Sequence, residues 1–266
     1  MAALPAKTLA IDWSGAKSGF EKKIWLAEAT TEGLVELRDG WSREGITGYL
    51  ASRAKERDLV VGLDFCFSFP AWFVRDAGRS TIDGFWRHVA ERGESWLDTK
   101  NVPEPFFRKG RWERRRSQFR HAEERLAAQG TPPETIFKLV GAKQVGPGSI
   151  RGMPCLLALR KAGFNIWPFD PPELPMVVEI YPRLFYGSVK KSSGEQRADF
   201  LSGLEGLDDE QRHRAGSSDD AFDAAVSALA MFERRQELAT LPQPADATLP
   251  AETALEGWIF GAPHDP

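Results

Sequence analysis

Acidic residues at the ends of apolar segments are the side chains of this chain best placed to do chemistry. Asp12 ends a short apolar run within LAIDWSGAKSG, Leu9 to Gly19, and Asp64 lies near the end of LVVGLDF, Leu59 to Phe65. A carboxylate at the end of a buried strand is costly unless a partner charge or a metal ion compensates it. Asp12 is therefore a candidate cation ligand. The alternative is that the strand simply ends there and the carboxylate meets water.

A second acidic group begins the clearest predicted helix, SSDDAFDAAVSALAMFERR, over Ser217 to Arg235. Asp220 and Asp223 are three residues apart, and Asp219 and Asp223 are four apart, so either pair projects from one face of the helix. Complementation of the positive end of the helix dipole explains Asp219 or Asp220. It explains Asp223 less well, because this residue lies one turn further in, between apolar neighbours. These acidic positions favour the cation-ligand interpretation of Asp12.

The segments around these residues predict the elements that position them. The first apolar run, KKIWLAEA (Lys22 to Ala29) and LVELRD (Leu34 to Asp39) predict a three-stranded antiparallel meander. Ser42 could cap the next helix, and the apolar run that contains Asp64 predicts a strand covered on both faces. This order describes the first half of a ribonuclease H-like fold. We expect an α/β domain with a mixed five-stranded sheet, three antiparallel strands plus parallel strands, flanked by helices.

The composition predicts one globular domain over residues 1–266. Of the 266 residues, 42% are hydrophobic, enough for a substantial core. Cys66 and Cys155 are the only cysteines, which indicates no disulfide framework. No apolar run approaches the roughly 20 residues that span a bilayer, and the N-terminus lacks the apolar centre of a signal peptide. We therefore expect a cytoplasmic location and no membrane partner. The net charge of −3 leaves room only for a local nucleic-acid-binding patch.

Residues 66–148 are predicted to form a mostly helical insertion. Apolar residues from Ile82 to Val89 mark an amphipathic helix that Gly93 could end. Residues 108–125 then hold eight Arg or Lys against three Glu, with aromatic residues interleaved. This composition suits phosphate contact and base stacking. A solvated helix face with Arg–Glu pairs is the alternative.

The later segments add a glycine-rich stretch, an internal acid and an apolar tail. GAKQVGPGSIRGMP, Gly141 to Pro154, predicts a loop whose backbone could approach a ligand, although such a stretch is more often a connection. Ser149 is expected to cap the following helix. Glu179, inside a predicted strand, is expected either to support the metal or to pair with Arg183. Residues 241–266 are predicted to be a linker followed by a tail that docks back through EGWIFG.

Five motifs in chain order carry a resemblance to a known family. IDWSGA, GLDFCFSFP, EIYPR, DDAFDAAVSALAM and EGWIFG together resemble domain of unknown function family 429, a bacterial and archaeal family predicted to be nucleases with a ribonuclease H-like fold. The fourth motif also resembles the C-terminal helix of Holliday-junction resolvases, whose acidic residues bind metal. These motifs run from near the N-terminus almost to the C-terminus, so the resemblance covers the whole chain.

The resemblance implies a ligand set for two divalent ions, Mg²⁺ or Mn²⁺. Asp12 would be the central ligand at the end of the first strand, and Asp64 the second. Asp220 and Asp223 would complete the set from the last helix. Oxygen ligands of this kind suit both ions.

The chain departs from ribonuclease H itself in one helix. After the third strand, where ribonuclease H carries a catalytic Glu, this chain offers only Glu44 and Glu56 near the helix ends. Glu179 could compensate from its strand as a ligand or as a group behind the ligands. Asp219 is a further candidate ligand.

These expectations combine into a metal-dependent nuclease or phosphodiesterase, in which two ions activate a water and stabilise the leaving oxygen. The expected substrate is nucleic acid, DNA or RNA. The residues expected to bind it are Trp13, Ser14, Lys17, Arg111, Arg114, Arg115, Arg116 and Lys143.

Two other function classes fit parts of the sequence. An actin-like or sugar-kinase-type ATP-dependent phosphotransferase is one, because IDWSGAKSG also resembles the glycine hairpin that holds ATP phosphates in that superfamily. The later half of the sequence offers no second hairpin of this type, which such an enzyme requires. The other is a non-catalytic module on a ribonuclease H-like scaffold that binds nucleic acid or protein through the basic segment 108–125.

Overall fold

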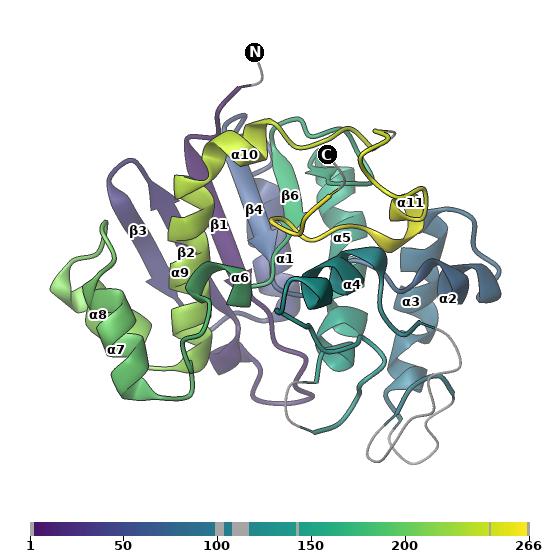
Figure 1. Cartoon of the computed structure of the whole chain (residues 1–266), viewed down its shortest axis with the longest axis horizontal. Coiled ribbons are helices and arrows are strands. Elements are labelled where there is room, and N and C mark those ends of the chain that lie inside the picture. The colour runs from purple at the N-terminus through teal and green to yellow at the C-terminus, as the bar shows by residue number, and fades with distance from the viewer. Residues whose placement is uncertain (1–2, 99–103, 108–116, 142–143, 245, 265–266) are drawn as a thin grey trace.

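A computed structural model describes residues 3–98, 104–107, 117–141, 144–244 and 246–264. Within these residues the centre is a six-stranded sheet in the order β3-β2-β1-β4-β6-β5 (Figure 1). The strands are β1 (Lys7–Asp12), β2 (Trp25–Thr30), β3 (Gly33–Arg38), β4 (Leu59–Leu63), β5 (Asn165–Ile166) and β6 (Met176–Glu179). β1, β2 and β3 pair antiparallel, and β4, β6 and β5 continue the sheet in parallel from β1. The predicted mixed sheet is confirmed. The expected number of five strands is wrong, because the short strand β5 pairs beside β6.

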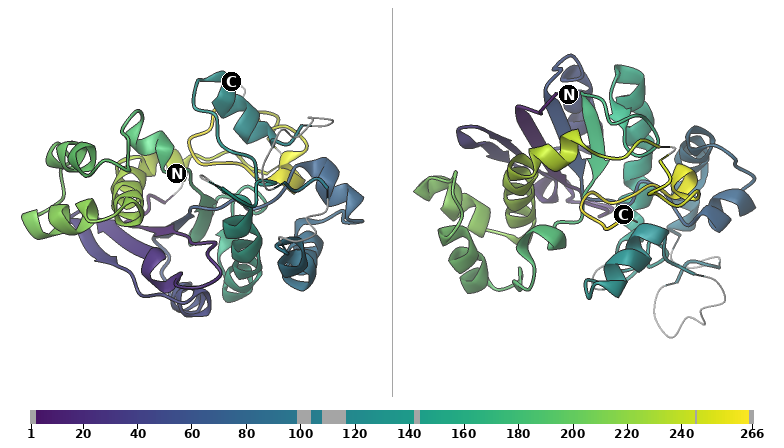
Figure 2. Two further views of the ribbon diagram at one scale, coloured as in Figure 1. Left: turned by 90° about the horizontal axis from the view of Figure 1, so that it is seen from below. Right: turned by 45° about the horizontal axis from the view of Figure 1, so that its top comes forward.

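Helices cover both faces of this sheet (Figures 1 and 2). α1 (Arg43–Ser52) and α5 (Gly146–Ala162) lie on one face with α3 (Ile82–Trp96) packed against α5, and α9 (Asp219–Glu233) lies on the other. The other described helices are α2 (Ala71–Asp76), α4 (His121–Ala128), α6 (Arg183–Tyr186), α7 (Gly194–Ser202), α8 (Asp209–Gly216), α10 (Arg235–Ala239) and α11 (Thr253–Glu256). None of the helices in the described part of the chain is both long and apolar enough to cross a membrane.

Small residues in the sheet allow α9 to lie close to it. Ala10 and Gly62 face α9, whereas Leu9 and Ile11 on the same strand as Ala10 face the opposite core. A Cβ atom at Gly62 would lie 2.5 Å from the Met231 sulfur of α9. The Thr8 hydroxyl also donates to the Ala228 carbonyl of α9 at 2.8 Å. The position of α9 is therefore fixed by direct contact with the central strands.

Two predicted boundaries on the other face are wrong. α3 continues past Gly93 to Trp96, because the missing side chain at Gly93 makes room for Ile150 of α5. α5 already begins at Gly146, so residues 146–154 are helical rather than a loop. Ser149 is not its cap: the hydroxyl donates to the Val145 carbonyl and accepts from the Cys66 amide. Proline is tolerated in a first helical turn, as at Pro147, because the amide that it lacks has no partner within the helix there.

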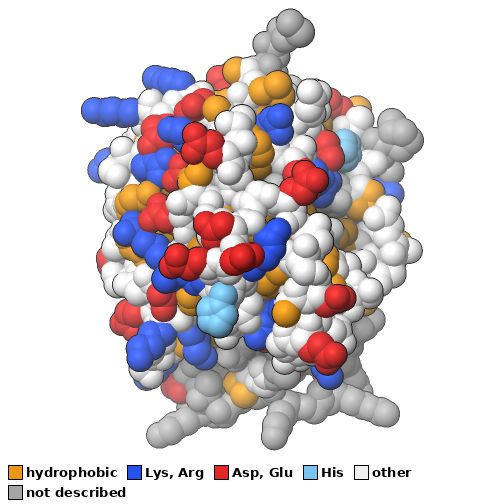
Figure 3. All heavy atoms as spheres, turned by 90° about the vertical axis from the view of Figure 1, so that its left-hand side faces the viewer, with side chains coloured by type: hydrophobic (Ala, Val, Ile, Leu, Met, Phe, Trp, Pro, Cys, Tyr) orange, Lys and Arg blue, Asp and Glu red, His pale blue; other side chains and the backbone are white. Residues whose placement is uncertain are grey.

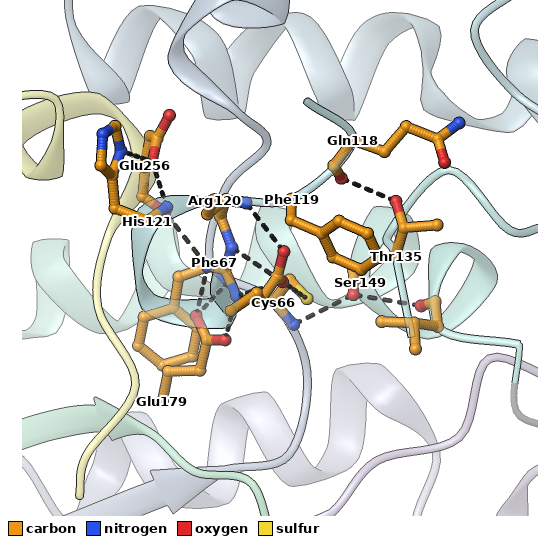
Figure 4. Close-up of polar contacts among 12 residues, drawn as sticks. Cys66, Phe67, Gln118, Phe119, Arg120, His121, Thr135, Ser149, Glu179 and Glu256 are labelled. Atoms are coloured by element: carbon orange, nitrogen blue, oxygen red, sulfur yellow. Dashed lines mark hydrogen bonds and ion pairs between the residues drawn. The ribbon is translucent and has the colours of Figure 1, made fainter. Parts of the chain in front are cut away.

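A buried ion network around Arg120 joins the insertion to the sheet (Figure 4). The fully buried Arg120 guanidinium donates to both carboxylate oxygens of Glu179 at 2.8 and 2.5 Å, and to Glu123 at 2.9 and 3.1 Å. Glu179 also accepts from the Phe67 amide at 2.8 Å. The expected pairing of Glu179 with Arg183 is therefore wrong. Arg120 belongs to the predicted basic segment, but its charge is used inside the protein.

The C-terminal segment enters the same network. The Glu256 carboxylate accepts from the Ala71 amide at 2.7 Å and from the His121 amide at 2.9 Å. The backbone carbonyl of Glu256 accepts from Arg120 at 3.1 Å. Beyond it, residues 258–260 are buried, and the Phe260 amide donates to the Glu179 carbonyl at 2.9 Å. The chain end thus lies against β6, next to Arg120 and its partners.

We predict that Arg120→Met lowers the free energy of unfolding by about 3–5 kcal/mol, because it leaves the carboxylates of Glu179 and Glu123 buried without their partner. Urea unfolding measures the change. Arg87→Met is the matched control: its side chain is 65% exposed and pairs with Asp83 at only 3.7 Å, so the expected change is below about 0.5 kcal/mol. Equal stability of the two variants would contradict the prediction.

Candidate metal centre

Two adjacent parallel strands bring Asp12 and Asp64 to the same edge of the sheet. Ile11 pairs with Leu63 in the register of β1 and β4, and the Asp64 amide donates to the Ile11 carbonyl at 3.1 Å. Asp12 is the last residue of β1, and Asp64 follows the last residue of β4. Because both strands point the same way, both carboxylates emerge at their carboxyl ends, where sites form in parallel sheets.

α9 supplies the third carboxylate. Ser218 caps the helix by accepting from the Ala221 amide at 3.0 Å, and Asp223 follows in the second turn, on the face that packs against β1 and β2. Its side chain is almost completely buried. One carboxylate oxygen each from Asp12, Asp64 and Asp223 lies within 4.8 Å of the others. These three residues are called the Asp triad below.

Burial and mutual repulsion make the charged state of the Asp triad unfavourable. Burial raises the pKa of Asp12 well above its ordinary value, and the charges of Asp223 and Asp64 add to this. Burial, reinforced by Asp223, raises the pKa of Asp64 from 3.8 to about 7. Burial raises the pKa of Asp223 to about 6, and Lys191 opposes the increase. A cation at this point would relieve the repulsion.

Lys191 is the cationic side chain in contact with the Asp triad, and the sequence did not indicate it. Its ammonium donates to Oδ2 of Asp223. Burial lowers the pKa of Lys191, but the charges of Asp223 and Asp12 outweigh burial, so its pKa lies above the ordinary value. The other oxygen of Asp223, Oδ1, is buried and has no hydrogen-bond partner within the described residues. An unpartnered buried carboxylate oxygen fits a metal ligand, and an all-oxygen donor set fits Mg²⁺ or Mn²⁺.

The other acidic candidates lie outside the Asp triad. Asp220 lines the same cavity as Asp12, and burial raises the pKa of its carboxylate. Asp219 is directed to Arg197, with Oδ1 accepting at 3.0 Å. Glu179 has both oxygens bonded to Arg120, so it is no free ligand. The sequence left open whether Asp219 or Asp220 accompanies Asp223 on the helix. Asp220 lines the cavity, and Asp219 does not.

A cavity of about 180 Å³ opens beside Asp12, which is the residue of the Asp triad that lines it. Its side-chain lining comes from Asp12, Trp13, Ser14, Lys23, Gln144 and Asp220. It adjoins a larger cavity of about 560 Å³, which Lys17 and Arg151 line. The two cavities share Gly15, Ala16, Gln144 and Pro147. The space next to the carboxylates is therefore bounded by the loop after β1 and by the start of α5.

Two arginines hold the loop after β1 in place. Arg43 of α1 donates to the carbonyls of Ser14 at 2.8 Å and Ala16 at 2.6 Å, and Arg151 of α5 donates to the carbonyl of Gly15 at 2.5 Å. Sequence reasoning missed both, because neither lies near the loop in the chain. With three consecutive carbonyls bonded to fixed guanidinium groups, the loop has a defined shape.

The expected substrate-binding residues lie in different environments, and several of them lie outside the described residues. Ser14 is buried, and its hydroxyl accepts from the Ala16 amide at 3.3 Å. Trp13 is 7% exposed, and its ring lies 5.2 Å from that of Phe65, so most of this residue belongs to the core. Lys17 is exposed at the larger cavity. The remaining ones lie outside the described residues: Arg111, Arg114, Arg115, Arg116 and Lys143.

Comparisons of the chain with protein-family models, with curated proteins and with solved structures found no match. The chemistry of the site therefore follows from its own geometry. Three carboxylates on rigid elements, one buried oxygen without a partner and an adjoining cavity are what a divalent-cation centre needs.

We predict that Gly15→Ala lowers the free energy of unfolding by about 1–3 kcal/mol through overpacking. A Cβ atom at Gly15 would lie 2.2 Å from the Gly148 amide nitrogen, so the loop after β1 must move away from α5. Gly48→Ala in α1 is the control, because no atom lies within 4 Å of its Cβ position. Helix propensity should make that variant slightly more stable, by up to about 1 kcal/mol. Thermal unfolding of both variants compares them, and a neutral Gly15→Ala would contradict the close packing.

We also predict that, in the metal-free protein, the Asp triad contributes a loss of stability as the pH rises from about 4 to about 7. An Asp with a raised pKa binds more protons in the folded state than in the unfolded state over this range, so deprotonation disfavours folding. Asp64→Asn removes one such group and should raise the free energy of unfolding at pH 8 by about 2 kcal/mol. Urea unfolding at pH 5 and pH 8 measures the effect.

Asp199→Asn is the control for this prediction, since Asp199 is exposed on α7. It should keep the wild-type pH dependence. If Asp64→Asn and the wild type lose stability in parallel between pH 5 and pH 8, then Asp64 is not the repelled carboxylate that its surroundings indicate.

Proposed function

We propose that this protein is a metal-dependent hydrolase of phosphodiester bonds, with nucleic acid as its substrate. The observation that carries the proposal is the Asp triad, in which two strand ends and one helix bring three carboxylates together and Oδ1 of Asp223 lacks a partner. The mixed sheet with acidic residues at two parallel strand ends and on α9 also agrees with the proposed ribonuclease H-like fold and with the resemblance to family 429.

In this proposal the acidic residues of the site and the loop after β1 would have different roles. Asp12, Asp64 and Asp223 would hold Mg²⁺ or Mn²⁺, and Asp220 would bind a water of the ion from the wall of the cavity. The bound ion would lower the pKa of a water and polarise a phosphoryl oxygen, as such ions do in hydrolases. The loop after β1, fixed by Arg43 and Arg151, would place the scissile phosphate beside the carboxylates.

The phosphotransferase alternative loses its main support in the structure. It rests on the glycine hairpin after β1, yet the space next to Gly15 is filled by the backbone of α5, with Gly148 in contact. Gly15 therefore serves helix packing. Within the described residues there is one sheet, whereas a phosphotransferase of that type needs two related domains.

The surface for the nucleic acid is proposed from the basic residues of the sequence. On the side of the molecule that carries β3, α7 and α8, acidic and basic side chains are interspersed, which does not favour tracking of a phosphate backbone (Figure 3). Lys23 and Lys17 line the two cavities and are candidate phosphate contacts. The basic segment 108–116, also proposed for this role, lies outside the described residues.

We predict that the wild type cleaves fluorescently labelled oligonucleotides in the presence of Mn²⁺ and that Asp12→Asn is at least about 100-fold slower, because it removes a ligand worth several kcal/mol in the transition state. Single- and double-stranded DNA and RNA are assayed in parallel, each with EDTA as a blank. Asp199→Asn, purified identically, should cleave at the wild-type rate.

Cleavage by Asp12→Asn at the wild-type rate would show a contaminating nuclease or a different site, and would end the proposal. Binding of the oligonucleotides without cleavage, unchanged in Asp12→Asn, would instead support the non-catalytic module.

A further inference from the structure

Lys191 reaches the Asp triad from outside α9, β1 and β4. It lies in the segment between α6 and α7, and its ammonium donates to Oδ2 of Asp223. The Asp223 side chain is 2% exposed and that of Lys191 is 38% exposed, so the cation is directed inward from the surface to a buried acid. A lysine at this point competes with a metal ion for one of the two Asp223 oxygens.

The backbone of Lys191 is held in position by Arg197 of α7. Arg197 is a buried residue, 8% exposed. Its guanidinium donates to the Lys191 carbonyl, to the Gly216 carbonyl at 2.9 and 3.1 Å, and to Asp219 at 3.0 Å. These contacts link the lysine directly to the start of α9. The position of Lys191 beside Asp223 is therefore fixed by the fold. It differs in this from an incidental ion pair between two mobile surface side chains.

The charges around the Asp triad match one divalent ion. Asp12, Asp64, Asp220 and Asp223 are the carboxylates of this group that have no arginine partner within the described residues. Asp219 and Glu179 also act on the group, but each is paired with an arginine. The ammonium groups that face the four carboxylates without an arginine are those of Lys191 and of Lys23, which lines the cavity with Asp220. When all four carboxylates are ionised, two negative charges remain, and one divalent ion neutralises them. A second ion would leave the cluster positive before any substrate binds.

The distribution of free oxygens agrees with this. Oδ1 of Asp223 is unpartnered and Oδ2 is bonded to Lys191, so the helix offers one ligand atom to the Asp triad. Asp220 and Asp219 are not within the triad, and Asp219 is bonded to Arg197. A second ion within the Asp triad would lack an oxygen from Asp223 unless Lys191 moved away.

We propose that the Lys191 ammonium occupies the place of a second cation beside Asp223, so that this centre takes one divalent ion where the sequence led us to expect two. The inference rests on the proposed metal-dependent function. During hydrolysis the ammonium would stabilise the negative charge that develops on the phosphate, the role that the second ion has in two-metal sites. It makes Lys191 a residue of the reaction centre.

The test is a calorimetric titration of the full-length protein with Mn²⁺ alone. The variants are Lys191→Met, Lys191→Arg and, as the matched control, Lys190→Met, whose lysine is the exposed neighbour in the chain. We expect one ion per chain for the wild type, Lys191→Arg and Lys190→Met. Lys191→Met should bind a second ion, or bind the first at least tenfold more tightly. Circular dichroism confirms that each variant is folded.

Two ions per wild-type chain would overturn the inference and leave the metal centre intact. The same stoichiometry and affinity in Lys191→Met as in the wild type would also overturn it. If Lys191→Met does not fold, the wild-type stoichiometry and that of Lys191→Arg still decide between one ion and two. Failure of the wild type to bind Mn²⁺ at millimolar concentration would overturn the proposed metal centre itself, and this inference with it.

Discussion

The need to compensate carboxylates at one edge of the sheet is the constraint on which the rest of the structure depends. β1, β4 and β6 are parallel neighbours, so Asp12, Asp64 and Glu179 all come at the carboxyl ends of their strands. A carboxylate withdrawn from water needs hydrogen bonds and a countercharge. The protein supplies these in two different ways on the two sides of β4. Glu179 receives an arginine with two parallel hydrogen bonds, and its carboxylate also accepts from the Phe67 amide. In the part of the chain that the structure describes, Asp12 and Asp64 receive no arginine, and the lysine nearby bonds to Asp223. We call the Glu179 side of this edge the closed side, because its carboxylate is paired with an arginine. We call the side of Asp12 and Asp64 the open side, because their carboxylates remain available to a cation.

The closed side explains why the insertion and the C-terminal segment dock where they do. Arg120 lies just before α4 and cannot neutralise Glu179 unless the chain from the insertion is brought over β6. The carbonyl of Glu256 then accepts from the same guanidinium, so the tail must follow. Because the charged groups are fully buried, a partial arrangement would leave an ion without its partner, and this makes the arrangement all or none. The segment directly after Asp64 is fixed as a consequence, since the Cys66 and Phe67 amides bond to Ser149 and Glu179.

The sequence predicted the parts of the site that depend on local pattern. Asp12 and Asp64 follow apolar runs, and Asp223 interrupts the apolar face of a capped helix, so each is recognisable within a few residues. The partners of these acids follow no such pattern. Lys191 is 32 residues from Asp223, Arg120 is 59 residues from Glu179, and Arg43 is 29 residues from Ser14. Only the fold brings them together, and nothing in FRH around Arg120 or in VKK, which ends at Lys191, marks a cation that will be buried. The start of α5 was missed for a related reason. Glycine and proline normally indicate a loop, but here Gly146 allows the helix to approach the Ile136 and Lys138 carbonyls closely, and Gly15 allows the loop after β1 to approach Gly148.

The open side is preorganised by contacts that require no metal. The strands that carry Asp12 and Asp64 are buried on both faces, α9 is bonded to β1 through Thr8, and the loop after β1 is held by Arg43 and Arg151. In small zinc domains the metal supplies the folding energy, because no core exists without it. Here two apolar cores enclose the sheet, and the carboxylates stand at its edge as a cost to stability. Such a cost persists only if the surrounding structure outweighs it. A cation that binds the Asp triad would therefore find its ligands already in place, and its binding energy would not be spent on ordering the protein.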